Sequence, residues 1–325
     1  MRRFAATILV LATILYVSGP ASAQIKLPPE TRNAALRYWM AFSDLQDPPS
    51  DKATQELLEK TAAGESPWDE AKLGSILDQN TQAIQEMQRA TKLPECDWGL
   101  EYGRGARASI GQLTRARVLA RLNMLYGMRM MAKGQPQQAV ESWLDGVRFS
   151  QHLAQGGTLI FKLVARAALL SDFQALTSAA QQGQLPTTQK AEAAKAIRSL
   201  PPDVFNWSEA LGLEATFAEA SAEELRLSKD PNAAYRDLYG ERQPANLVLP
   251  SEHDLVAFRS VIAQAQDALR LPAKEARGRL DQLQKQLGQS GDYLEGATPS
   301  LVKINDARAE VEAARTKLLQ VLAAN

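Results

Sequence analysis

The sequence predicts an all-α fold built from antiparallel helical hairpins. Long stretches rich in Ala, Leu, Gln, Glu and Arg alternate with short clusters of Gly and Pro. None of these stretches shows the sustained alternation of apolar and polar residues that marks a half-buried strand. Helix starts are also well marked, because Ser66-Pro67 and Thr298-Pro299 each combine a capping hydroxyl with Pro at the first helical position.

The first 23 residues are typical of a cleaved secretory signal peptide. Arg2 and Arg3 precede the uncharged run from Phe4 to Val17, and a small-x-small cleavage pattern ends at Ala23. The uncharged run is shorter than the roughly 20 residues that a membrane-spanning helix needs. We therefore expect an exported protein, periplasmic or secreted, that begins at Gln24 and has no membrane span after cleavage.

Capping residues and Gly–Pro connectors divide the rest of the chain into helices. The segment 157–182 is apolar almost all round, which predicts a helix at the buried centre of the stack. In chain order, helices are expected at about 30–46, 51–63, 67–91, 108–133, 136–153, 157–182, 187–199, 205–228, 252–270, 273–288 and 299–324.

These helices fall into an array and a C-terminal pair. Two similar connectors, 133–136 and 183–186, each carry a Gly that ends one helix and a Pro near the start of the next, which indicates successive hairpins within 24–238. A loop marked by Gly and Pro spans 239–250, and 251–325 is expected to form a C-terminal helical hairpin. Apolar residues recur at intervals of three and four between Ile304 and Val321, which favours pairing of 299–324 with 252–270.

The segment 120–153 resembles a single tetratricopeptide repeat. Gly127 lies twelve residues before Ala139, and Trp143 and Gly146 follow Ala139 by four and seven residues. At these spacings the repeat places small residues where its two helices cross and an aromatic side chain in the next groove. The resemblance implies a stack of helix pairs in which Trp143 is a packing anchor. Positions that depart from the family's usual residues are Asn123, Tyr126, Met130 and Gln151.

Such repeats present their first helix to a concave groove. The resemblance places Arg121, Met124, Leu125 and Met128 on that face and implies a protein or peptide partner. The clamp that some family members use for acidic peptide tails is missing apart from Arg121. The whole chain, with its 94–99 loop, is also similar to a group of exported helical proteins, which implies no activity.

Charge is balanced overall but segregated along the chain. Without Arg2 and Arg3, about as many basic as acidic residues remain, which argues against nucleic-acid binding. The segment 102–140 contains no acid and carries seven basic residues, among them Arg117 and Arg121, whereas 205–228 carries five Glu and one Arg. Either these two surfaces neutralise each other, which the overall balance favours, or the arginines line a basic groove aimed at an anionic partner.

The loop around residues 93–105 has an unusual composition. It brings Glu95, Asp97, Trp98 and Tyr102 close together in sequence. One interpretation is a ligand pocket with stacking rings and polar acids, as in an α-helical enzyme acting on cell-envelope carbohydrate. The other is a connector held to the helices by a buried Trp98. The single cysteine, Cys96, excludes an internal disulfide and is expected to be a small buried side chain.

Signatures of nucleophilic and phosphate chemistry are missing from the sequence, including G-x-S-x-G, H-E-x-x-H and G-x-x-x-x-G-K-[ST]. His152 and His253 are too far apart to suggest a structural metal site. We therefore expect no catalytic residue, cofactor or metal, and a helical-repeat scaffold that binds a protein or peptide partner in the cell envelope. The candidate partner-binding residues are Arg117, Arg121, Met124, Met128, Glu95, Asp97, Trp98 and Tyr102.

Overall fold

The described part of the chain is helical, which confirms the all-α prediction. A computed structural model describes residues 31–240, 247–288, 293 and 298–324, and these contain no β-strand. Within these ranges no helix is both long and apolar enough to cross a membrane. The expected signal peptide lies outside the described residues, so export and cleavage after Ala23 stay predictions.

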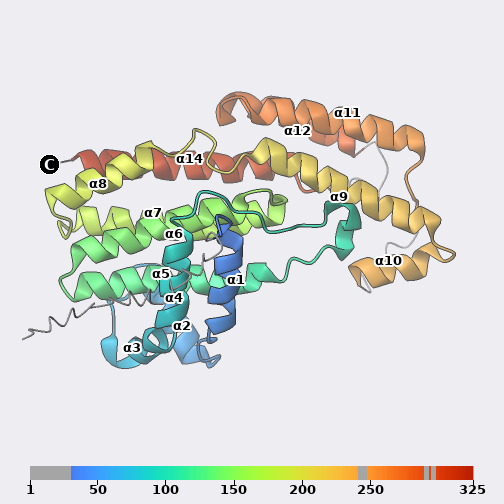
Figure 1. The fold of residues 1–325 in the computed structure, drawn as a ribbon. Helices are drawn as coiled ribbons and strands as arrows, with labels where there is room; N and C mark the ends of the chain where they lie inside the picture. The colour runs from blue at the N-terminus through green and yellow to red at the C-terminus, as the bar shows by residue number, and fades with distance from the viewer. Residues whose placement is uncertain (1–30, 241–246, 289–292, 294–297, 325) are drawn as a thin grey trace, which may run out of the picture. The chain divides into compact units, whose positions relative to one another are not determined.

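Most helices begin and end within about four residues of their expected positions. Their order along the chain is visible from blue to red in Figure 1. Their bounds are α1 Ala34–Asp44, α2 Lys52–Ala62, α3 Glu70–Gln79, α4 Thr81–Ala90, the 3-10 helix η1 Tyr102–Arg107, α5 Gln112–Ala132, α6 Pro136–Ala154, α7 Leu159–Gln181, α8 Thr187–Arg198, α9 Trp207–Leu227, α10 Pro231–Tyr239, α11 Glu252–Leu269, α12 Ala273–Leu287 and α14 Leu301–Ala323.

Helices α5, α6 and α7 lie side by side as antiparallel neighbours (Figure 1). Because each is antiparallel to α6, helices α5 and α7 run parallel, and they pack against each other along a shared seam. Gly127 of α5 lies against the indole of Trp143, and Gly146 of α6 lies against the carboxyl group of Asp172, so a methyl group at either glycine would overlap its neighbour. The glycines and Trp143 thus make the close helix crossing that the spacing predicts, although the repeat type itself stays a prediction.

The segment 67–91, expected to be one helix, forms two. Helices α3 and α4 meet at Asn80, whose backbone has φ −105° and ψ 8°. Its buried side-chain amide accepts a hydrogen bond from the N–H of Gln46 at 2.8 Å and donates one to the carbonyl of Ile76 at 2.9 Å. The break therefore depends on a contact with the chain that follows α1.

Two short helices in the described part of the chain were not expected from the sequence. Helix α10 follows α9, and Asp230 caps it by accepting a hydrogen bond from Ala233 N–H, with Pro231 at the first helical position. This is the same cap-then-Pro signal that marks other helix starts. The 3-10 helix η1 packs on α9, where the N–H of Ala106 donates to the hydroxyl of Ser221 at 2.9 Å.

Helix α14 packs against α7, α8 and α12, while α11 packs against α9 and α12. The expected principal pairing of 299–324 with 252–270 is therefore not the one seen. Arg315 of α14 donates hydrogen bonds to the backbone carbonyls of Arg198, Leu200 and Pro201 at the end of α8. From Arg32 onward the chain forms one compact unit.

Candidate functional site: a groove between helices α5 and α7

Two adjoining cavities lie along the seam between α5 and α7. Ala62, at the end of α2, lines both of them, and we treat them as one α5–α7 groove. The arginine pocket, about 340 Å³, is lined by Ala62, Thr114, Arg117, Val118, Ala120, Arg121, Met124, Val164, Ala167, Ala168 and Ser171. The methionine pocket, about 350 Å³, is lined by Ala62, Gly64, Glu65, Ser66, Pro67, Trp68, Met128, Met131, Ala132, Trp143, Gln174, Ala175, Ser178, Ala179, Gln182 and Gln184.

Helical periodicity brings these side chains onto one face. The lining residues of α5, and likewise those of α7, are mostly spaced by three or four positions, as neighbours on one side of a helix must be. The α7 side consists largely of Ala and Ser, whereas α5 contributes long Arg and Met side chains. Of the positions expected to face a groove, Arg117, Arg121, Met124 and Met128 all line it. Leu125 lines neither cavity, and its side chain is fully buried.

The arginine pocket is basic. Its lining residues include two arginines and no acid. Arg117 is exposed and forms no ion pair with any described residue. Arg121 is partly buried, and this burial lowers the pKa of its guanidinium. The nearby charge of Arg117 lowers this pKa as well, whereas the charge of Glu59 acts in the opposite direction. The Nη2 atom of Arg121 reaches Oε1 of Gln55 at 3.4 Å, a long contact that leaves the charge in place.

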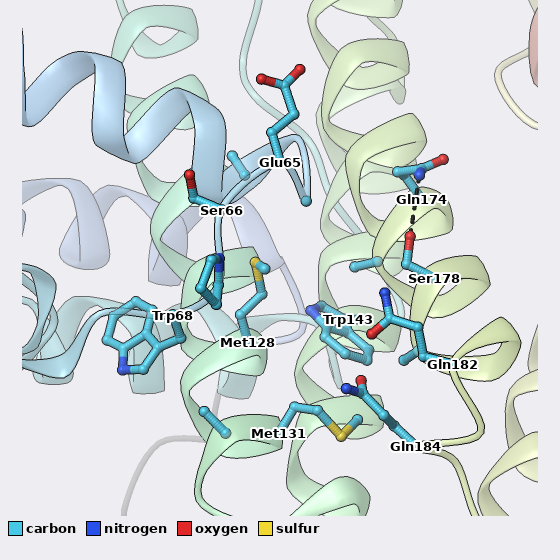
Figure 2. A pocket seen from close by; sticks show the side chains of 16 residues that line it. Glu65, Ser66, Trp68, Met128, Met131, Trp143, Gln174, Ser178, Gln182 and Gln184 are labelled. Atoms are coloured by element: carbon cyan, nitrogen blue, oxygen red, sulfur yellow. Dashed lines mark hydrogen bonds between the residues drawn. The ribbon is translucent and has the colours of Figure 1, made fainter.

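The methionine pocket is apolar at its centre and polar at its rim. Figure 2 shows Met128, Met131 and Trp143 in the middle, with Gln182 and Gln184 on the α7 side. Glu65 is the one charged residue among those that line this pocket. A flexible methionine surface adapts to apolar side chains of different shapes, so this pocket can accept either an aliphatic or an aromatic group.

Trp143 forms part of the floor of the methionine pocket. Its side chain is 2 % exposed, and its indole N–H donates a hydrogen bond to the carbonyl of Met124 at 3.1 Å. Trp143 therefore links α6 to α5 beneath the groove.

The 93–105 loop is attached to helices by its aromatic residues. Trp98 is 7 % exposed and stacks on Tyr38 and Phe42, with ring centroids 5.6 Å and 6.2 Å apart. Its indole N–H donates to the carbonyl of His152 at 2.9 Å. The hydroxyl of Tyr102 donates to the carbonyl of Gly156 in the turn before α7. These contacts match the connector interpretation of the loop.

The acidic residues of the same loop bond to neighbouring groups of the protein. Glu95 pairs with Arg32 at 2.9 Å, and Asp97 accepts a hydrogen bond from the N–H of Gly99 at 2.9 Å. Glu95, Asp97, Trp98 and Tyr102 are not among the residues that line the α5–α7 groove. Between them Cys96 is buried, and burial raises the pKa of its thiol to about 12, which makes it a poor nucleophile.

The basic residues of 102–140 pair mainly with the N-terminal helices. The sequence favoured pairing of these residues with the acids of 205–228. Among the described residues, one such ion pair forms, between Arg107 Nε and Glu224 Oε1 at 2.6 Å. The other pairs bring α3, the chain after α1, and α10 onto this segment. These pairs are Arg107–Asp237, Arg115–Asp47, Arg129–Glu70, Arg129–Asp78 and Lys133–Glu70, and Arg104 pairs locally with Glu101.

The α7 side of the groove was not predicted from the sequence. Gln174, Ser178 and Gln182 recur every four residues on a helix that was expected to be buried all round. That polar stripe was a readable signal of an exposed face. The two buried charged residues of α7 contact α6 instead: Lys162 donates to the carbonyl of Ala154, burial lowers its pKa to about 8, and Asp172 lies against Gly146.

These features define an all-helical protein with an open groove that joins one basic pocket and one apolar pocket. The chain matches no protein-family model, no curated protein and no solved structure.

Proposed function

We propose that this chain is an exported helical scaffold that binds a protein or peptide partner along the α5–α7 groove. The observation that carries the proposal is the groove itself, with two cavities of about 340 and 350 Å³ along one seam. Cavities of this size accommodate ligand groups, and apolar surface rimmed by polar side chains is typical of interaction sites. The positive charge of Arg117 and Arg121, in a pocket whose lining contains no acid, adds long-range attraction for an anionic partner.

Export is supported by the N-terminal sequence. Arg2 and Arg3, the uncharged run and the small residues up to Ala23 have the order of a signal peptide. N-terminal sequencing of the protein recovered outside the cytoplasm should therefore read from Gln24. A chain that still begins at Met1 would contradict this part of the proposal.

Groove binding is testable by photo-cross-linking in cells that export the protein. Thr114 and Gln174 are exposed and line the arginine and methionine pockets, respectively, and each can be replaced by benzoylphenylalanine. Gln282, exposed on α12, serves as the matched control. We expect the same adduct from both groove positions and none from the control. No adduct from the groove, or an equal adduct from all three positions, would contradict the proposal.

The alternative function, an enzyme acting on cell-envelope carbohydrate, depends on Glu95, Asp97, Trp98 and Tyr102 lining a ligand pocket. Their described contacts hold the loop to α1, α6 and the turn before α7. No contact of these residues favours the enzyme over the scaffold.

A further inference from the structure

The two pockets of the groove differ in charge. The arginine pocket contains Arg117 and Arg121 without an acid, and the methionine pocket contains Glu65 without a base. A carboxylate suits the first pocket, because the guanidinium group offers paired N–H donors to its two oxygens. The same carboxylate would be repelled by Glu65 in the second pocket. A bound segment therefore has a preferred direction along the groove.

The rim of the methionine pocket favours an extended segment over a helix. The side-chain amides of Gln182 and Gln184 form no hydrogen bond with any described residue. An extended peptide carries unpaired backbone N–H and C=O groups, to which such amides can bond. A helix satisfies its backbone internally and would leave these amides with water alone.

The length of the groove sets the spacing between the two ligand groups. On α5, the middle of the arginine pocket and the middle of the methionine pocket are about eleven residues apart, which corresponds to ~16 Å along a helix. On α7, the two sets of lining residues are separated by nearly the same number of positions. An extended chain rises ~3.3 Å per residue, so it covers this distance in about five residues.

We propose that the groove selects an extended peptide segment of a partner protein, with a carboxylate side chain in the arginine pocket and an apolar side chain in the methionine pocket, about five residues apart. This inference rests on the proposed peptide-binding function. It specifies the chemistry, the conformation and the direction of the bound segment.

The test begins with a displayed library of random peptides, about twelve residues long, selected against the protein from Gln24 to Asn325. Among the enriched peptides, Asp and Glu should concentrate about four to six residues from an apolar side chain, on one side of it only. Enrichment without an acid, or with the acid at unrelated distances, would overturn the inference. No enrichment of any peptide would overturn the proposed function as well.

Two groove variants then locate the binding of a fluorescent version of the most enriched peptide. Arg117→Glu should weaken binding at least about tenfold, as the loss of a charge-assisted contact does, and a peptide with Lys in place of its acid should recover binding to this variant. Ser178→Tyr fills part of the methionine pocket and should weaken both peptides. Arg279→Glu, an exposed reversal on α12, is the matched control and should change nothing.

The outcomes distinguish the acidic specificity of the groove from the proposed peptide binding itself. If Ser178→Tyr weakens binding but Arg117→Glu does not, the groove binds peptides and the acidic specificity is wrong. If neither variant changes binding, the groove is not the peptide site and the proposed function fails too. Misfolding is controlled by thermal unfolding of each variant. Arg117→Glu is expected to keep the fold, because it replaces a like-charged pair with Arg121, four residues on, by an opposite pair.

Discussion

At the scale of single residues, the groove depends on pairs of small and large side chains in neighbouring helices. Gly127 leaves room for the indole of Trp143, and this indole forms part of the pocket floor. The sequence spacing identified both residues, because small residues are required where two helices cross. It could not identify Asp172, whose carboxyl group lies against Gly146, since nothing in the sequence shows which α7 residue faces that glycine.

Trp143→Ala should lower the free energy of unfolding by about 3–5 kcal/mol, the usual range for removing a buried large aromatic side chain. The side chain is 2 % exposed, and its truncation would leave a cavity and remove the hydrogen bond from the indole to the carbonyl of Met124. Urea unfolding measures the change. Trp143→Phe keeps part of the packing and should lose less. A loss below about 1 kcal/mol for the alanine variant would show that the position is not a packing anchor.

His152 should make the protein sensitive to mild acid. Burial, followed by repulsion from Arg148, lowers its pKa from 6.5 to about 4, and its Nδ1 lies 2.8 Å from the hydroxyl of Tyr38. Between these two pKa values the unfolded chain binds the proton and the folded chain does not. Stability is therefore lost as the pH falls from 6.5 towards 4, by up to about 3 kcal/mol from this group.

Urea unfolding of the wild type and of His152→Gln, at several pH values between 7 and 4, tests this dependence. The variant lacks the titrating ring, so its stability should fall less steeply with acid than that of the wild type. Carboxylates such as Glu70, whose pKa is lowered to about 2 by hydrogen bonds from Arg129 and Trp68, contribute equally to both proteins. Parallel pH curves for the two proteins would contradict the prediction.

At the scale of helices, local sequence signals located most elements but not their interruptions. Pro136 and the glycine before it placed the α5–α6 turn correctly, because their backbone preferences act locally. The signal for α10, an Asp230 cap followed by Pro231, was equally local and was overlooked. The break between α3 and α4 was different. It depends on Asn80 bonding to Gln46, a contact between segments that are distant in sequence.

Asn80→Ala should destabilise the α3–α4 corner by about 1–3 kcal/mol, because it removes both hydrogen bonds of a buried amide, one from the N–H of Gln46 and one to the carbonyl of Ile76. Asn80→Asp keeps the oxygen that accepts the hydrogen bond from Gln46 but loses the N–H that donates to Ile76. Its loss of unfolding free energy should therefore differ from that of Asn80→Ala. Hydrogen exchange of the Gln46 amide reports the contact directly. Unchanged protection of this amide in the alanine variant would show that Asn80 does not hold the corner.

At the scale of the whole molecule, ion pairs connect segments that the sequence treats as separate. Overall balance of charge indicated internal pairing, but it could not assign the partners. Arg129 bonds to Glu70 and Asp78 of α3, which fixes the α3 segment against α5. Arg117 is left without an acid. The one exposed groove arginine with no partner was therefore visible only once the others had been paired in space.

The C-terminal helices are coupled to the array in the same way. The sequence places a boundary at 239–250, but α14 packs on α7 and α8, and α11 packs on α9. Arg166 of α7 pairs with Glu310 of α14, and Arg315 of α14 bonds to the carbonyls that end α8. We therefore expect the chain from Gln24 to Asn325 to unfold in a single urea transition, with the same midpoint by circular dichroism and by tryptophan fluorescence.

A truncated chain ending at Pro250 provides the sharper test of this coupling. Without α11, α12 and α14, the α7 face that packs on α14 and the α9 face that packs on α11 would be exposed to water. The fragment should then bind a hydrophobic dye and lose its sharp transition while keeping much of its helical signal, as a loosely packed state does. If it instead unfolds cooperatively and retains binding of the groove peptide, residues 24–250 fold on their own. The C-terminal helices would then be a separate domain.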